Sequence, residues 1–95
     1  VTNDEIRDVQ NLNLSLDVNG ERHQTGNTNS MIFSFNFLIA HLSNYITLMP
    51  GDIITTGTPP GVGLGMNPPK FLKNGDEMVL KVDNLGQQIT KVIAE

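Results

Sequence analysis

The chain has 95 residues, a formal net charge of −4 and no cysteine. A chain of this length forms one small domain at most, because it buries only about 60% of the surface that it exposes when unfolded. Without cysteines, neither disulfides nor thiolate-bound metals can compensate for a thin core, so partner surface is the remaining source of stability. The six basic residues are scattered, which excludes a nucleic-acid-binding surface from the expected functions.

The longest apolar-leaning stretch covers residues 31–49, and polar residues such as Ser34, Asn36 and His41 interrupt it. A transmembrane helix needs about 20 consecutive apolar residues, so no membrane span is predicted. The chain begins at Val1 with no signal-peptide pattern, and this start fits a piece of a longer protein. We expect a cytoplasmic location, in a reducing compartment.

A β-hairpin is the first predicted element. Apolar and polar residues alternate over residues 12–18, which is the period-2 pattern of a half-buried strand. An Asn-Gly pair follows at residues 19–20 and predicts a tight turn, because both central residues of a type I′ turn need positive φ. Residues 21–25 are predicted to form the returning strand, and Gly26 to end it.

A single amphipathic helix is predicted next. Residues 27–30 (Asn-Thr-Asn-Ser) are all of types that cap helices. Apolar residues follow at helical spacing and predict a helix running to about Tyr45. These residues are Ile32, Phe35, Leu38, Ile39, Leu42 and Ile46.

All five prolines and five of the nine glycines lie between residues 50 and 69. Residues 52–56 are predicted to form a short strand at the start of this region, followed by a long loop, and long loops are usually functional. A second hairpin is predicted with arms at residues 78–82 and 87–93. The pattern as a whole predicts a β-rich α+β domain over residues 1–95.

Residues 48–63 read LMPGDIITTGTPPGVG. This stretch resembles the signature L-x-PGD-I-x-TGTP-x-GVG of the fumarylacetoacetate hydrolase family. More specifically, it is similar to the branch with acylpyruvate hydrolases and 2-hydroxyhepta-2,4-diene-1,7-dioate isomerases. VNGE at residues 18–21, Q-x-GNT at 24–28 and MIF at 31–33 agree with that branch in the same order. FLKNGD at 71–76 is similar to its FLKPGD, with Asn74 where proline is usual.

The resemblance implies that the chain is the C-terminal portion of a mixed β-sheet roll, in an enzyme that is usually dimeric. It also implies a small oxo acid substrate and a divalent metal, Mg²⁺, Mn²⁺ or Ca²⁺, held by carboxylates. Lewis acid catalysis by this metal would polarise a carbonyl group of the substrate. The reaction would be C–C hydrolysis, isomerisation or decarboxylation, of the kind found in aromatic compound catabolism.

The family's metal ligands, a Glu-x-Glu pair and a later Asp, lie before the segment that matches Val1. Its catalytic lysine and its His–Glu pair also lie upstream. We therefore expect no catalytic residue and no metal ligand within residues 1–95, and we expect the isolated chain to be inactive. The contribution expected of this chain is one wall of the substrate pocket.

Thr58 is the strongest candidate for substrate binding. The resemblance implies that its hydroxyl binds a substrate carboxylate, and Gly57 beside it belongs to the same motif. A hydroxyl and free backbone N–H groups in a glycine-rich segment are suited to holding an anion. The alternative is that residues 57–59 form only a tight turn.

Asn27 is a weaker candidate for the edge of the pocket, and a structural role near the helix start explains it equally well. His23 and His41 are interpreted as surface residues, because no third ligand stands at metal-binding spacing. The glycines at 61, 63 and 65 fit no phosphate-binding motif and predict only an unusual loop backbone.

Two functions from different classes remain open. The first is the enzyme segment described above, and the second is a stand-alone, non-catalytic β-rich oligomerisation domain that has kept only the fold. A Glu-x-Glu pair and a later Asp in the upstream reading frame would favour the enzyme. A start codon at the beginning of this segment would favour the second function.

Overall fold

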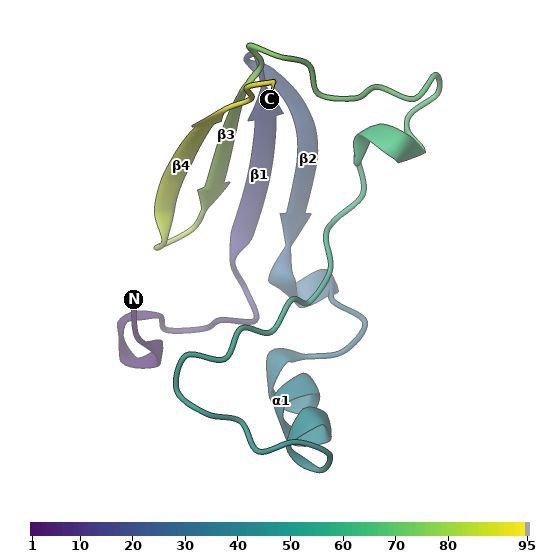
Figure 1. Cartoon of the computed structure of the whole chain (residues 1–95). Coiled ribbons are helices and arrows are strands. Elements are labelled where there is room, and N and C mark those ends of the chain that lie inside the picture. Colours follow the sequence, from purple (N-terminus) through teal and green to yellow (C-terminus); the bar gives the residue numbers. More distant parts are fainter. Residues whose placement is uncertain (95) are drawn as a thin grey trace.

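The computed structural model describes residues 1–94 and contains one four-stranded antiparallel sheet (Figure 1). Its strands are β1 (Asn13–Val18), β2 (Glu21–Asn27), β3 (Glu77–Val82) and β4 (Gly86–Lys91). They lie in the order β2-β1-β3-β4, so the two predicted hairpins join through the pairing of β1 with β3. The predicted β-rich α+β class is confirmed.

Both hairpin turns use the residue types expected of them. Asn19 and Gly20 have φ of 51° and 80°, and Asn84 and Gly86 have φ of 60° and 84°. Asparagine and glycine tolerate positive φ, which explains why they occur at the two turns, as a consecutive pair in the first and on either side of Leu85 in the second.

The α-helix in the described residues, α1 (Phe35–Ser43), is shorter than predicted. The Ser34 hydroxyl accepts a hydrogen bond from the Phe37 backbone N–H at 3.2 Å and caps the helix. Asn27 instead caps a 3-10 turn, Thr28–Ser30, so the predicted helix start at residues 27–30 is wrong. Two further 3-10 turns lie at Asn3–Glu5 and Gly63–Gly65. At the other end, helical structure stops at Ser43, two residues before the predicted end.

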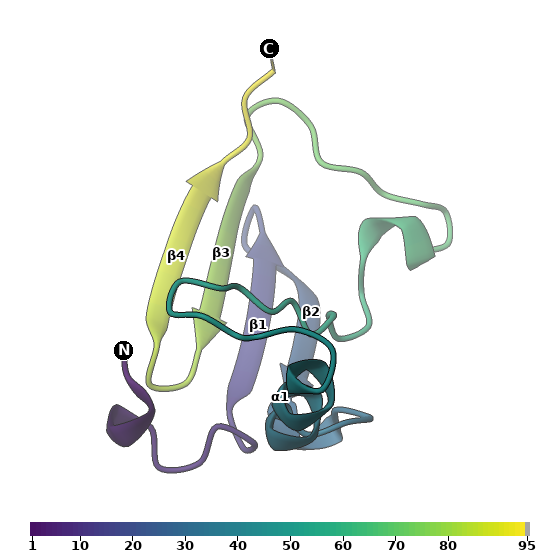
Figure 2. The same cartoon turned by 60° about the horizontal axis from the view of Figure 1, so that its bottom comes forward.

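Two other predictions differ from the structure. β2 continues through Gly26 to Asn27, because Gly26 pairs with Leu14 and Asn27 with Asn13 of β1. A glycine at position 26 also lets Pro59 approach, since a Cβ there would lie 2.8 Å from the Pro59 Cβ. Residues 52–56 form no strand, since a strand needs a partner and none of the described strands pairs with them. They belong instead to the long connection between α1 and β3 (Figure 2).

The two faces of the sheet differ in character. Leu14, Leu16 and Val18 of β1 are in register with Val82, Leu80 and Met78 of β3, which gives one apolar face. The intervening positions of β1, such as Ser15 and Asp17, point to the opposite, polar face. The segment after Pro59 lies on the apolar face, where Pro59 meets Gly26 of β2.

Burial within the described residues is slight. Leu12 and Val18 are the buried apolar side chains, each 6% exposed, and Thr28 is the buried polar one. Thr28 binds the chain before β1 to the end of β2, since its hydroxyl accepts from the Leu12 N–H at 2.9 Å and donates to the Val9 carbonyl at 2.8 Å. α1 lies beyond this end of the sheet (Figures 1 and 2). Among residues 1–94, no helix has the length and apolar character needed to cross a membrane.

Candidate functional site

Thr58 is exposed, and it lies on the loop that crosses the apolar face of the sheet. The Gln24 side chain of β2 reaches this loop. Its amide nitrogen, Nε2, donates to the Thr58 Oγ1 at 2.7 Å and to the Pro59 carbonyl, also at 2.7 Å. A half-buried side chain of the sheet therefore fixes the position of the exposed threonine.

Gly57 has φ of +91°, in the region that favours glycine. Space does not require a glycine here, because a Cβ at this position would meet nothing within 4 Å. In the described part of the chain, neither Gly57 nor Thr58 donates its backbone N–H to a protein acceptor. Two backbone donors and one hydroxyl are thus gathered at one exposed point.

The loop after Thr58 is held to β2 by close backbone packing. Gly61 has φ of +109°, and a Cβ on it would lie 2.0 Å from the His23 carbonyl oxygen. Gly63 packs equally closely against the carbonyl of Lys70, within the same loop. The prediction of an unusual loop backbone is confirmed at Gly61, where both the conformation and the close approach require glycine, and is wrong at Gly63 and Gly65, which do not have positive φ.

Asn27 lies on the same strand as Gln24, and its amide is already occupied. Its Nδ2 donates to the side-chain oxygens of Asn11 and Asn13 at 3.1 and 3.0 Å, and its Oδ1 accepts from the Asn29 N–H at 2.9 Å. This network uses both of its N–H donors. The structural role that the sequence left open is therefore present.

A cavity of about 410 Å³ lies between the apolar face of the sheet and residues 61–73. Gln24 lines it, whereas Thr58 does not. At its rim the Lys70 ammonium donates to the Glu21 carboxylate at 2.9 Å, and this hydrogen bond lowers the pKa of Glu21 from its ordinary value.

His23 also lines this cavity and is half-buried, so its interpretation as a surface residue is wrong. Its Nε2 is buried and has no hydrogen-bond partner among the described residues. The physical reason for its burial is a β-bulge. The register of β1 and β2 shifts so that Leu16 pairs with Gln24 and Asp17 with Arg22, which leaves His23 as the extra residue of the bulge. His41, on α1, is exposed as predicted.

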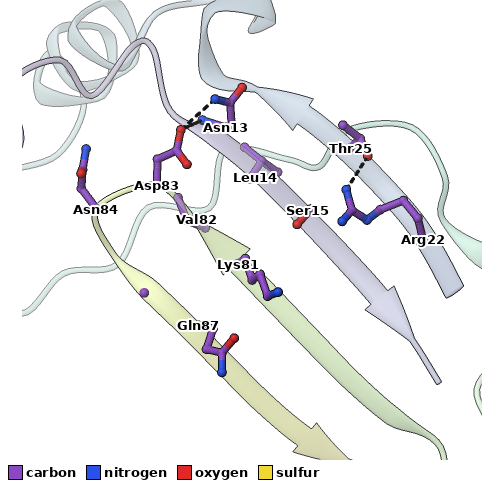
Figure 3. A pocket seen from close by; sticks show the side chains of 11 residues that line it. Asn13, Leu14, Ser15, Arg22, Thr25, Lys81, Val82, Asp83, Asn84 and Gln87 are labelled. Atoms are coloured by element: carbon purple, nitrogen blue, oxygen red, sulfur yellow. Dashed lines mark hydrogen bonds between the residues drawn. The ribbon is translucent and has the colours of Figure 1, made fainter. Parts of the chain in front are cut away.

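A wider, open hollow of about 890 Å³ lies on the polar face of the sheet (Figure 3). Two of its charged side chains, Asp83 and Arg22, are bonded to neighbouring side chains. Asp83 accepts from the Asn13 side chain at 2.8 Å, and Arg22 donates to Asp17, which lowers the pKa of Asp17 from its ordinary value. The larger hollow is therefore a solvated polar surface and is not the candidate site.

No three His, Cys, Asp or Glu side chains within residues 1–94 lie close enough together to hold a metal ion. A hard divalent cation takes about six oxygen ligands. The described residues therefore do not form such a site by themselves, and none of them is assigned to a metal.

The candidate site and its sequence motif lie within a segment that matches a known protein family. Residues 1–93 match the family model described as "Fumarylacetoacetate (FAA) hydrolase C-terminal". The chain belongs to the fumarylacetoacetate hydrolase family. A protein of Burkholderia ambifaria named "Putative hydrolase" is 54% identical over 90 residues, which cover 94% of this chain and 32% of that protein.

Solved structures of the fumarylacetoacetate hydrolase family confirm the fold. The fumarylacetoacetate hydrolase of Exiguobacterium antarcticum has a TM-score of 0.95 at 37% identity, over 100% of this chain and 34% of that one. The maleylpyruvate hydrolase of Sphingobium sp. SYK-6, in complex with manganese(II) and pyruvate, has a TM-score of 0.87 at 35% identity. That match covers 98% of this chain and 33% of the other, so the chain spans about a third of the length of its relatives.

Reasoning from the sequence placed Thr58 and Gly57 together but missed Gln24. The glutamine stands in the Gln-x-Gly-Asn-Thr motif, where only the Gly-Asn-Thr part was assigned a role. The motif was a visible signal, but nothing in a single sequence pairs residue 24 with residue 58.

Proposed function

We propose that this chain is the C-terminal segment of a divalent-metal-dependent enzyme that acts on small oxo acids. The observation that carries the proposal is the exposed group of donors at Gly57 and Thr58, where two backbone N–H groups and the hydroxyl hydrogen of Thr58 have no acceptor within the described residues. Hydrogen bonds from such donors to a carboxylate are stronger than those between neutral groups. The motif that contains them is also the one that resembles the family signature.

The proposed substrate carries a carboxylate next to a carbonyl group. A structural relative with this fold is a maleylpyruvate hydrolase in complex with manganese(II) and pyruvate, a 2-oxo acid. This supports an acylpyruvate-like substrate and C–C bond hydrolysis. Isomerisation or decarboxylation of a related dioate remains within the proposal, because a fold alone does not set the reaction.

In the proposed site, Thr58 and Gly57 bind the substrate carboxylate. Asn27 shapes the rim of the same site. Its neighbour Gly26 packs against Pro59, and Pro59 is the neighbour of Thr58. The metal, Mg²⁺, Mn²⁺ or Ca²⁺, would be held by residues upstream of this segment. The enzyme is proposed to be a cytoplasmic homodimer.

Thr58→Val in the full-length enzyme tests the proposal, because it removes the hydroxyl and nearly keeps the side chain's shape. A hydrogen bond to a charged group contributes about 1.5–3 kcal/mol, so kcat/KM for acetylpyruvate should fall roughly ten- to two-hundred-fold. The Kd of pyruvate, measured by calorimetry on the manganese-loaded enzyme, should rise by a similar factor. If the carboxylate is held equally in ground and transition states, the loss appears mainly in KM.

The alternative function of this residue, a simple turn, predicts the reverse result. Thr58→Val would then lower the melting temperature and leave kcat/KM unchanged. Thr58→Ser is the matched control, since it keeps the hydroxyl and should retain most of the activity.

A further inference from the structure

The Gln24 amide has a fixed orientation. Its Nε2 lies 2.7 Å from the Pro59 carbonyl oxygen, which can only accept a hydrogen bond. An amide turned the other way would bring two oxygens together at this distance, so the NH₂ group must face the loop. An amide nitrogen has two hydrogens, and the second points to the Thr58 Oγ1, also at 2.7 Å.

This orientation determines what the Thr58 hydroxyl can do. Because Gln24 donates to it, the hydroxyl oxygen is an acceptor in this pair and its own hydrogen is free. That hydrogen is bonded to no acceptor within residues 1–94. Thr58 is exposed, so the free hydrogen is available to a ligand.

We infer that Gln24 is a positioning residue, which keeps the Thr58 hydroxyl aimed as a donor toward the substrate carboxylate. Gln24 donates one hydrogen to the loop backbone and one to the hydroxyl, so it sets both the place and the direction of that donor. It acts through Thr58 and does not touch the substrate. The inference rests on the proposed function, in which Thr58 binds the carboxylate.

The site is arranged for this role. Gln24 is half-buried and pairs with Leu16, in the middle of β1, so its backbone is held by the sheet. Gly61, which packs on the His23 carbonyl beside it, brings the loop within reach of the side chain. A rigid strand thus supports an exposed donor, so less conformational entropy is lost when a ligand binds.

The test measures the Kd of pyruvate for the full-length enzyme loaded with Mn²⁺. Gln24→Met keeps the length of the side chain and removes both donors, and we expect the Kd to rise about three- to tenfold. Gln24→Glu has nearly the same shape, but its carboxylate accepts the Thr58 hydrogen that the ligand needs. Its Kd should rise further at pH 7, and the rise should shrink at pH 5, where the carboxyl begins to protonate and can donate again.

A double-mutant cycle identifies the route of the effect. In the Thr58→Val background, Gln24→Met should change the Kd by less than about twofold, because the group that it positions is gone. In the Thr58→Ser background, the three- to tenfold effect should persist. Gln10→Met is the matched control: Gln10 also bonds backbone groups, at Thr28 and Phe35, so its loss should lower stability and leave the Kd unchanged.

Failure of the inference is distinguishable from failure of the proposed function. If Thr58→Val weakens pyruvate binding and Gln24→Met does not, Gln24 is no positioning residue and the proposed function stands. If the two losses simply add, Gln24 acts independently of Thr58 and the inference is overturned. If Thr58→Val leaves the Kd unchanged, or the unaltered enzyme does not bind pyruvate, both are overturned.

Discussion

The two hairpins of the sheet receive unequal cover from the rest of the chain. On the first, β2 carries the loop that follows Pro59, and Val18 of β1 is 6% exposed. On the second, every residue of β4 is exposed, including Ile89 at 58%. The described chain therefore stabilises the half of the sheet that bears the candidate site, and leaves the other half to surfaces that residues 1–94 do not supply.

The largest effect that we expect is that the chain loses its fold when it is studied alone, without the surfaces that would cover the second hairpin. Among residues 1–94, eighteen large apolar side chains are exposed, and a thin core offers little to offset them. We expect the 95-residue chain alone to associate or to unfold without a sharp transition, by light scattering and calorimetry. A monomer that melts sharply would contradict this expectation and would favour the stand-alone domain.

Glycine substitutions test directly how closely the rest of the chain packs on each hairpin. In the full-length enzyme, Gly61→Ala places a Cβ 2.0 Å from the His23 carbonyl oxygen at φ of +109°, and should destabilise by about 3 kcal/mol or more. Gly86→Ala, at the start of β4, is matched in the sign of φ, but a Cβ there meets nothing within 4 Å. The backbone strain of positive φ alone should then lower the free energy of unfolding by about 1–2 kcal/mol. Equal losses in denaturant unfolding would show that the loop does not pack on β2 as described.

The smallest expected effect lies where the hairpins meet. The Asp76 carboxylate accepts from the Asn19 side chain at 2.9 Å and from the Lys73 backbone N–H at 2.7 Å, and these hydrogen bonds lower its pKa from its ordinary value. A lowered pKa in the folded state stabilises the fold at pH values above the ordinary one, near 4, and this contribution is lost as pH falls through the lowered pKa. Asp76→Asn should therefore destabilise more at pH 7 than at pH 3. A pH-independent difference in urea unfolding would show that the charge contributes nothing.

The local elements could be predicted from the sequence wherever one short signal determines them. The strand alternation around Asn19-Gly20 gave the first hairpin, because an Asn-Gly pair favours a two-residue turn between antiparallel strands. It did not indicate the β-bulge at His23, which shifts the register. The helix start was misplaced because five residues able to cap a helix occur between Asn27 and Ser34, and propensity does not choose among them. Residues 52–56 have the composition of a strand, but composition does not supply a partner.

The candidate site could be predicted only in part, for the same reason. Thr58 and Gly57 are adjacent and carry a motif, so one segment of sequence was enough to name them. Gln24 meets Thr58 only because Gly26 and Gly61 allow the loop to approach β2. The contact is a property of packing between distant segments, and no pattern within either segment indicates it.

The strand order β2-β1-β3-β4 has a consequence for the synthesis of the protein. β1 lies inside the sheet, yet its second partner is β3, where Leu14 pairs with Val82. On the ribosome, β1 and β2 can pair early, but one edge of β1 stays open until α1 and the whole loop have emerged. Contacts between such distant residues slow folding, and an open strand edge invites pairing with another chain. Nascent chains that pause between α1 and β3 should therefore be the ones most dependent on chaperones.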